Sequence, residues 1–385
     1  MERRYFNEEH KLLRDMVREF AASEVEPLSD ELDKESRFPH ELIKQMAELG
    51  LMGVPVPAAY GGADMDYVAY TIAVHELAKV DASVAITMAA HISLGTMPIM
   101  EFGSEAQKKK YLPKLAAGEM LGAFGLTEPG AGSDAGATAT TAVLKGDRYI
   151  INGEKAFCTN AGHAGVITFT AKVIQDGEVQ GINAFVVDAG TPGLRLGQPE
   201  KKMGWRASDT RSLYFEDMEL TSDHLLGSAA KGFKQFLATL TGGRISVGAI
   251  GLGTGEGAYL KALAYSKERE AFGQSISNFQ GIQFKLADMA TQLEAAKHLV
   301  YHAAWLKDQG YDVRNEAAMA KLFATELAMA ITTEAIQIHG GYGYIREYQV
   351  ERFFRDAKVL EIGEGSSEVQ RMIIGQQILT SQESL

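Results

Sequence analysis

A glutamate between two glycines, at Gly363-Glu364-Gly365, is the residue of this sequence best suited to acid–base chemistry. The glycines allow a turn in which the carboxylate is aimed at a ligand. A carboxylate held in this way can accept a proton as a general base. A Gly-Glu-Gly turn on its own is usually exposed to solvent, so a catalytic role needs support from other segments.

Three earlier segments offer groups that suit a planar or phosphorylated ligand. The first, 124–134, is rich in small residues that let the backbone approach a ligand, and its Thr127 and Ser133 can donate hydrogen bonds. In the second, 157–162, an aromatic residue followed by threonine can line a heterocycle. In the third, the guanidinium of Arg269 suits a pyrophosphate, because its planar fork matches paired oxygens. Taken singly, the first segment is better explained as a surface loop and the third as an exposed helix end. The second is about as consistent with a core aromatic residue before a turn.

A fourth segment extends from Gln337 to Arg371 and contains Glu364. It begins with a run of three glycines, Gly340, Gly341 and Gly343. Behind the glutamate, Ser367 is followed three residues later by a glutamine, the pattern of a capping box. This pattern predicts that the last helix begins there.

Together these segments resemble those of acyl-CoA dehydrogenases, and most closely the short-chain (butyryl-CoA) type. They occur in the family's order and at its spacings: Leu126-Thr-Glu-Pro-Gly-Ala-Gly-Ser-Asp134, Arg269-x-x-Phe-Gly273, Gln337-x-x-Gly-Gly341-x-Gly343 and Glu364-Gly-x-x-x-x-Gln-Arg371. The resemblance covers essentially the whole chain. It implies FAD-dependent α,β-dehydrogenation of an acyl-CoA thioester to the trans-2-enoyl-CoA. It also implies a homotetramer that passes its electrons to an electron-transferring flavoprotein.

The resemblance also implies roles for individual residues. Glu364 would abstract the α-proton while flavin N5 takes the β-hydride. The residues expected to line the flavin are Phe124, Leu126, Thr127, Gly132, Ser133, Phe157, Cys158 and Thr159. Those expected to reach the FAD of a neighbouring subunit, or to complete and close that site, are Arg269, Phe272, Gln280, Gln337, Gly340, Gly341, Ser366, Ser367 and Glu368. The residues expected to meet acyl-CoA are Ser133, Thr241, Arg244 and Gly365.

Several positions bear on this assignment. Glu361 is the rival carboxylate, but the resemblance gives it no role. Some relatives carry the base immediately before the arginine matched by Arg244, and here that residue is Gly243. Thr241 stands where the family often has Asp, which leaves part of the contact with CoA in doubt. Near the expected acyl pocket the chain offers His91 but no arginine, which disfavours a dicarboxylyl substrate.

Two other classes of function remain open. One is an oxygen-using relative, an acyl-CoA oxidase or a flavin monooxygenase; the monooxygenase would not need the base. The other is a non-catalytic helical protein that binds acyl-CoA. No metal site is expected, because Glu294, His298 and His302 lie on one helix face without the further ligands that a metal requires.

Composition and charge limit the kinds of partner and the cellular location that are expected for this protein. The 385 residues include 38 Lys and Arg against 50 Asp and Glu, a net charge of −12 that argues against nucleic-acid and anionic-membrane binders. The lone cysteine, Cys158, excludes an internal disulfide framework. The N-terminus lacks the character of a signal or transit peptide, and no stretch is apolar for long enough to suggest membrane insertion. A cytoplasmic, bacterial location is expected, or the mitochondrial matrix if a transit peptide has been removed.

The elements that position these segments follow an α–β–α order, an α+β multidomain fold. Residues 1–121 are expected to form an N-terminal helical domain, 122–231 a mainly antiparallel β-domain, and 232–385 a C-terminal domain resembling a four-helix bundle. Asn152-Gly153 predicts a hairpin turn between Ile151 and Ala156, and Asp176-Gly177 predicts a second one. The glycine run from Gly248 to Gly257 lies in a helical pattern and predicts close helix packing rather than a phosphate loop.

Overall fold

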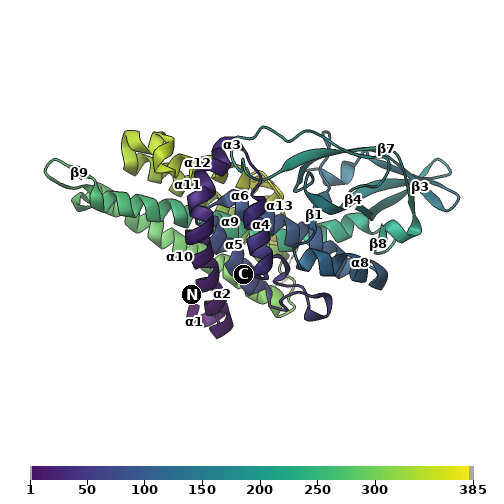
Figure 1. Ribbon diagram of the computed structural model, residues 1–385, viewed down its shortest axis with the longest axis horizontal. Coiled ribbons are helices and arrows are strands. Elements are labelled where there is room, and N and C mark those ends of the chain that lie inside the picture. The colour runs from purple at the N-terminus through teal and green to yellow at the C-terminus, as the bar shows by residue number, and fades with distance from the viewer. Residues whose placement is uncertain (1, 381–385) are drawn as a thin grey trace.

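The computed structural model describes residues 2–380 and has the three expected regions in an elongated subunit (Figure 1). The β-sheet lies at one end, the hairpin containing β9 lies at the opposite end, and helices fill the space between them. The α+β fold class, with helical, β and helical parts, is therefore confirmed. The exact boundaries at 121/122 and 231/232 stay predictions.

The N-terminal region is a cluster of helices, two of which begin with a capping box. Asn7 and Ser104 each form this box with the residue three positions later. Two short π-helical stretches, η1 (Ala21–Val25) and η5 (His91–Thr96), continue α2 and α6. The helices are α1 (Glu2–Tyr5), α2 (Glu8–Phe20), α3 (Ser29–Glu35), α4 (His40–Glu48), α5 (Tyr67–Ala78), α6 (Ala82–Ala90), α7 (Met97–Phe102) and α8 (Glu105–Ala116).

The middle region is one mixed sheet in the order β6-β7-β3-β2-β4-β5-β8, with β1 pairing with β4. The pairs β1–β4 and β2–β4 are parallel and the other pairs are antiparallel, so the sheet is mainly antiparallel as predicted. The predicted turn at Asp176-Gly177 joins β4 to β5, and both residues have positive φ. The strands are β1 (Leu121–Gly125), β2 (Thr141–Lys145), β3 (Arg148–Thr159), β4 (Ala164–Gln175), β5 (Glu178–Asp188), β6 (Leu194–Leu196), β7 (Thr210–Thr221) and β8 (Leu225–Leu226).

The hairpin predicted at Asn152-Gly153 is wrong. Both residues lie inside the continuous strand β3, where the register against β7 shifts between Ile151 and Gly153. The Asn152 side chain exchanges hydrogen bonds with the side chain and backbone of Asp217 on β7. The Asn-Gly pair therefore forms a β-bulge, which uses the same backbone freedom as a turn.

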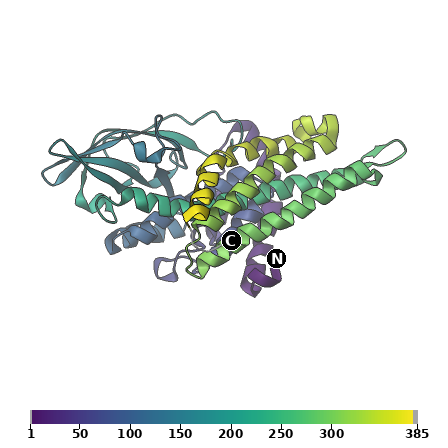
Figure 2. The ribbon, with the colours of Figure 1, turned by 180° about the vertical axis from the view of Figure 1, so that it is seen from behind.

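The C-terminal region consists of long helices that run side by side away from the sheet (Figure 2). Its buried side chains form one apolar core together with those of the N-terminal helices. The helices are α9 (Gly232–Glu268), α10 (Gln280–Asp308), α11 (Arg314–His339), α12 (Val350–Leu360) and α13 (Ser367–Thr380), and the distal hairpin is β9 (Glu270–Ala271) with β10 (Gln274–Ser275).

The glycine run of α9 lies in a helix that packs closely against its neighbours, as predicted. A Cβ added at Gly251 would lie 3.0 Å from the carbonyl oxygen of Ala324 on α11, and one at Gly253 would lie 2.5 Å from that of His75 on α5. A Cβ at Gly257 would overlap the carbonyl oxygen of Lys79. Small residues here let three helices approach at backbone distance.

We expect Gly257→Ala to destabilise the fold by about 1–3 kcal/mol, because the added methyl group must push the backbone of Lys79 aside. Gly375→Ala in α13 is the matched control, since a Cβ added there would have no neighbour within 4 Å. That control should gain up to about 1 kcal/mol from helix propensity. Denaturant unfolding of both variants measures the difference, and equal shifts would contradict the packing explanation.

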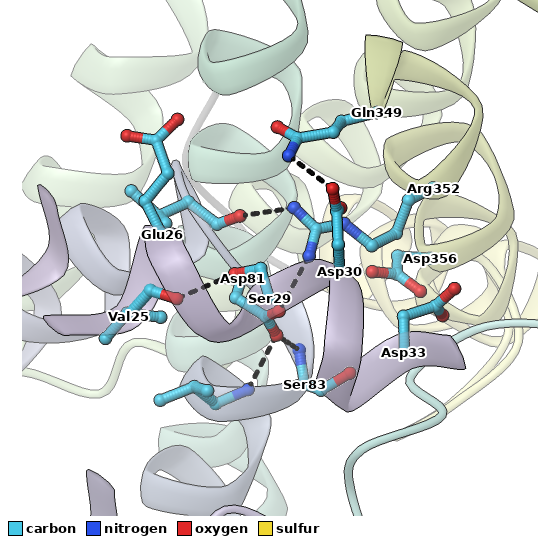
Figure 3. A network of polar contacts seen from close by, with 12 residues as sticks. Val25, Glu26, Ser29, Asp30, Asp33, Asp81, Ser83, Gln349, Arg352 and Asp356 are labelled. Carbon is cyan, nitrogen blue, oxygen red and sulfur yellow. Dashed lines mark hydrogen bonds and ion pairs between the residues drawn. The ribbon is translucent and has the colours of Figure 1, made fainter. Parts of the chain in front are cut away.

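Charged residues of α12 connect the three regions, and Figure 3 shows one of these connections, from Arg352 to Asp81. The buried Arg352 donates to Asp81, the N-cap of α6, at 3.0 Å, and to the carbonyl oxygen of Val80. Asp356, also buried, accepts a 2.6 Å hydrogen bond from the backbone N–H of Trp205 in the middle region. Burial and the nearby Asp81 raise the pKa of Asp356 to about 7. The network therefore joins N-terminal, middle and C-terminal segments inside the protein.

Contrary to the sequence-based expectation, two helical segments reach the length and hydropathy of a membrane span. They are Ala82–Phe102 and Gly232–Glu268. However, 83% and 78% of their most apolar windows are buried inside the protein, as in the core helices of a globular fold.

Candidate active site

Glu364 lies in the short turn between α12 and α13. Glu364 and Gly365 both adopt positive φ, 51° and 89°, a conformation that is costly for a residue with a side chain. The carbonyl oxygen of Gly365 accepts hydrogen bonds from Lys321 Nζ at 2.9 Å and from Gln370 Nε2 at 2.8 Å. Gln370 Nε2 also donates to the carbonyl oxygen of Glu364 at 3.2 Å. Side chains from two helices thus hold the strained turn.

The predicted capping box of Ser367 and Gln370 is wrong. The cap lies one residue earlier, where Ser366 Oγ accepts a 3.4 Å hydrogen bond from the N–H of Val369. The amide of Gln370 is used for the turn instead. The sequence pattern located the helix start to within one residue but misassigned the side chains.

The Glu364 carboxylate is sheltered although the residue as a whole is half-buried. Its Oε2 is out of contact with solvent and has no hydrogen-bond partner among residues 2–380. The oxygen lies directly over Gly243 of α9, where any Cβ would overlap it. Gly243 is the position at which some relatives are expected to carry their base. In this chain the Glu364 carboxylate fills the space that a side chain at that position would need.

Two cations act on this carboxylate. Burial raises the pKa of Glu364 to about 7, and the nearby charges of Lys321 and Arg244 oppose that rise. Arg244 is itself buried, with no hydrogen-bond partner for its Nε among the described residues, and burial lowers its pKa. A carboxylate that is protonated and deprotonated near neutral pH suits proton transfer.

The rival carboxylate Glu361 is bound differently. Its Oε2 forms a 2.6 Å ion pair with Lys358, one turn earlier in α12, and Lys358 is half exposed. Such a pair is common at helix ends. It gives the Glu361 carboxylate an ion-pair partner, whereas Glu364 Oε2 has no hydrogen-bond partner among the described residues.

A buried ion pair anchors the segment 124–134 to the sheet. Lys155 of β3 is fully buried, and its Nζ lies 2.6 Å from Glu128 Oε1. The same carboxylate accepts hydrogen bonds from Thr138 Oγ1 and, at 2.5 Å, from the backbone N–H of Ala139. Burial alone would raise the pKa of Glu128, but the hydrogen bonds from Lys155 and Thr138 outweigh it and lower the pKa to about 2. We call this group the Glu128–Lys155 clasp.

The predicted flavin-lining residues lie in β1, in the loop that follows it and at the end of β3. The side chains of Phe124 and Leu126 are buried, and the ring of Phe124 stacks on Phe236 at 4.1 Å. Burial raises the pKa of the Cys158 thiol to about 12. The exposed or half-exposed members of the set are Thr127, Gly132, Ser133, Phe157 and Thr159. Phe157 is 68% exposed and has a positive φ of 56°. Its aromatic ring is therefore turned towards the outside of the subunit.

A second set of predicted residues gathers at the opposite, helical end. A cavity of about 540 Å³ brings Arg269 together with Gly340 and Gly341. The Arg269 guanidinium lies over the ring of Tyr342 at 5.6 Å. The ring of Phe272, in the hairpin beside it, is 95% exposed. Gln280 and Gln337 are exposed as well, at the start of α10 and near the end of α11.

One subunit does not bring these two sets together. The sheet and the hairpin after Arg269 lie at opposite ends of the molecule in both views (Figures 1 and 2). Glu364, Gly365 and Arg244 belong to the helical C-terminal region.

One residue near the expected acyl pocket is buried, and one residue expected to meet CoA makes a hydrogen bond within its own helix. His91 is fully buried and is not available to an acyl pocket: its Nε2 lies 3.1 Å from the carbonyl oxygens of Met52 and Leu115, and its Nδ1 accepts from the N–H of Gly122. Thr241 Oγ1 bonds back to the carbonyl oxygen of Leu237, one turn earlier in α9.

Sequence reasoning missed Lys321 and the clasp. A lysine in a helical pattern is normally assigned to the surface, and only the apolar residues around it hint at burial. Within residues 2–380 no cluster of three or more His, Cys, Asp or Glu has the arrangement of a metal site. His298 instead lies 3.5 Å from Glu294, and the ring of His302 stacks on Trp305.

Three models of one known protein family match nearly the whole chain. The acyl-CoA dehydrogenase N-terminal, middle and C-terminal domain models match residues 7–119, 123–218 and 230–379.

Individual relatives are similar over most or nearly all of their length. The chain is 48% identical to the short-chain-specific acyl-CoA dehydrogenase of Clostridium acetobutylicum, over 96% of this chain and 98% of that one. It superposes on butyryl-CoA dehydrogenase from Megasphaera elsdenii with a TM-score of 0.94 and 44% identity, covering 97% and 99% of the two chains. It also superposes on an acyl-CoA dehydrogenase from Bacillus anthracis solved in complex with FAD, with a TM-score of 0.91 and 36% identity, covering 97% and 67%. The chain therefore belongs to the acyl-CoA dehydrogenase family of oxidoreductases.

Proposed function

We propose that this chain removes the α- and β-hydrogens of an acyl-CoA thioester in a FAD-dependent reaction, with Glu364 as the base that takes the α-proton. The observation that carries the proposal is the state of this carboxylate. It is sheltered, has no hydrogen-bond partner among the described residues, is held in a strained turn and has a pKa raised to about 7. A glutamate with only a structural role would not need this arrangement.

The chemistry follows from what an α-C–H requires. A thioester α-proton is weakly acidic, so the site must offer a strong base and must stabilise negative charge on the thioester oxygen. Burial makes the Glu364 carboxylate a stronger base than an exposed one. Its own backbone N–H, in the same turn, is the proposed donor to the thioester oxygen. FAD, when bound, accepts the β-hydride.

The proposed FAD site combines both ends of the subunit. Phe157, Thr127 and Ser133 would hold the flavin at the sheet end, and the exposed aromatic ring of Phe157 fits a flat heterocycle. Arg269 and the glycines beside the distal cavity would bind the pyrophosphate part. Because the sheet and the distal hairpin lie at opposite ends of one subunit, we infer that a complete site needs a second copy of the chain. This requirement supports an oligomer, which the predicted homotetramer would provide.

The proposed substrate is a short, unbranched acyl-CoA such as butyryl-CoA. The relatives from Clostridium acetobutylicum and Megasphaera elsdenii, whose names specify short-chain and butyryl substrates, support this choice. An electron-transferring flavoprotein is the proposed electron acceptor, and a cytoplasmic location is proposed for both proteins.

Anaerobic reduction of the purified holoenzyme tests the reaction. Butyryl-CoA should bleach the flavin absorbance within the dead time or in a fast phase, and air should restore it slowly. Rapid peroxide formation on admitting air would identify an oxidase instead. A colourless protein that cannot take up FAD would leave only acyl-CoA binding. A panel of acyl-CoA thioesters with an artificial acceptor then ranks chain lengths.

A further inference from the structure

We propose that Lys321 is a positioning residue for the base: it holds the turn that carries Glu364 and supplies a positive charge that favours the ionised form of this carboxylate. The inference rests on the proposed function, since it assigns a second residue to the same proton transfer. Lys321 comes from α11, a different helix from those on either side of the turn.

The burial of this lysine is costly and needs compensation. The Lys321 side chain is fully buried, and an ammonium in the protein interior is strongly unfavourable unless it is compensated. Its Nζ donates to a backbone carbonyl oxygen, that of Gly365, at 2.9 Å. Burial lowers the pKa of Lys321 to about 8, and the charge of Glu364 is the strongest influence opposing that shift. Near neutral pH the ammonium is therefore mostly charged, and it is bound to the residue that follows the base.

The geometry of the turn also depends on this lysine. Two consecutive residues with positive φ, Glu364 and Gly365, persist only when surrounding groups hold them. The carbonyl oxygen of Gly365 has two donors, Lys321 Nζ and Gln370 Nε2. One donor is a cation and the other is neutral, so the two contacts share a geometric role and differ in charge.

The electrostatic surroundings couple Lys321 to Glu364. Lys321 is the charge that most opposes the effect of burial on Glu364, followed by Arg244. The charged groups acting on Lys321 are Glu364, Glu361, Arg244 and Glu326. Glu361 is already paired with Lys358, and Glu326 with Arg371. Glu364 is thus the carboxylate of this group for which no ion pair competes with Lys321.

The test compares Lys321→Met with Gln370→Met. Each variant removes one hydrogen-bond donor to Gly365, and only the first also removes a charge. In both, kcat for butyryl-CoA should fall by about 10- to 100-fold with little change in KM, because the base is less well aimed. In Lys321→Met alone, the acidic limb of the profile of kcat/KM against pH should move to higher pH by roughly one unit or more. The sign follows because losing a nearby cation makes the carboxylate easier to protonate.

Lys321→Arg is the conservative variant and should retain the wild-type position of the acidic limb, even if its bulk lowers the rate. Flavin content and the unfolding midpoint identify any variant that fails to fold, and in that case Lys321→Arg and Gln370→Met still report on charge and geometry. Wild-type activity with equal pH profiles in Lys321→Met and Gln370→Met would overturn the role of Lys321 and leave the proposed function intact. A wild-type protein whose flavin no acyl-CoA reduces would overturn the proposed function itself.

Discussion

Glu364→Gln should bind acyl-CoA and FAD as the wild type does and yet lose flavin reduction by about 10⁴-fold, near the upper end of what a general base contributes. Glutamine has nearly the same shape, so the turn and its contacts from Gln370 and Lys321 should remain. The amide cannot accept the α-proton. Stopped-flow reduction with butyryl-CoA measures the loss, and spectral perturbation of the flavin by bound ligand measures binding.

Glu361→Gln is the matched control for this prediction. It removes a carboxylate three residues away that is paired with Lys358, so flavin reduction should stay within about twofold of wild type. The pH profile provides an independent check. Because the base must be ionised and its pKa is raised to about 7, kcat/KM of the wild type should increase with pH through about 7. Similar losses in both variants would contradict the assignment of the base.

Breaking the Glu128–Lys155 clasp should have the largest effect on stability. Lys155→Met leaves the buried Glu128 carboxylate without its ammonium, and such a loss typically costs about 3–5 kcal/mol. Segment 124–134 should also lose its fixed position, so FAD uptake should weaken. Denaturant unfolding and flavin titration measure the two effects.

The matched control is the double variant Glu128→Gln/Lys155→Met, which removes both charges. It should recover part of the stability lost in Lys155→Met, because no unpaired charge remains buried. Acid should act on the wild-type clasp in a defined direction. The pKa of Glu128 is lowered to about 2 in the fold, so its contribution is complete above the ordinary glutamate pKa of about 4.3 and is lost as the pH falls towards 2. A double variant no more stable than the single one would contradict the clasp.

The parts of the fold that depend on local signals were predictable from the sequence. Asn7 and Ser104 begin helices because their side chains cap backbone N–H groups within the same turn. The pair Asn152-Gly153 correctly indicates a place where the backbone departs from regular strand geometry, but the hairpin predicted from it is wrong. A turn and a β-bulge use the same residues, and only the pairing of β3 with β7 distinguishes them.

The site was predictable where its residues form contiguous motifs. Glu364 could be singled out from its flanking glycines and its resemblance to a family, and the structure adds its shelter over Gly243. The contacts of Lys321 and of the Lys155 ammonium could not be predicted, because they depend on which distant segments meet in space. His91 shows the opposite error, since a polar residue near an expected pocket proved to satisfy three buried backbone groups.

The charged network of α12 has a consequence for how the subunit loses its structure. Arg352 and Asp356 bond to Asp81 and to the backbone of Trp205, and each of these contacts crosses between regions that the family treats as separate domains. Removing the N-terminal or the middle region would take away the partner of Arg352 or of Asp356, and losing the partner of a buried charged group is destabilising. We therefore expect the three domains, which the sequence distinguishes, to lose their structure together in thermal melting.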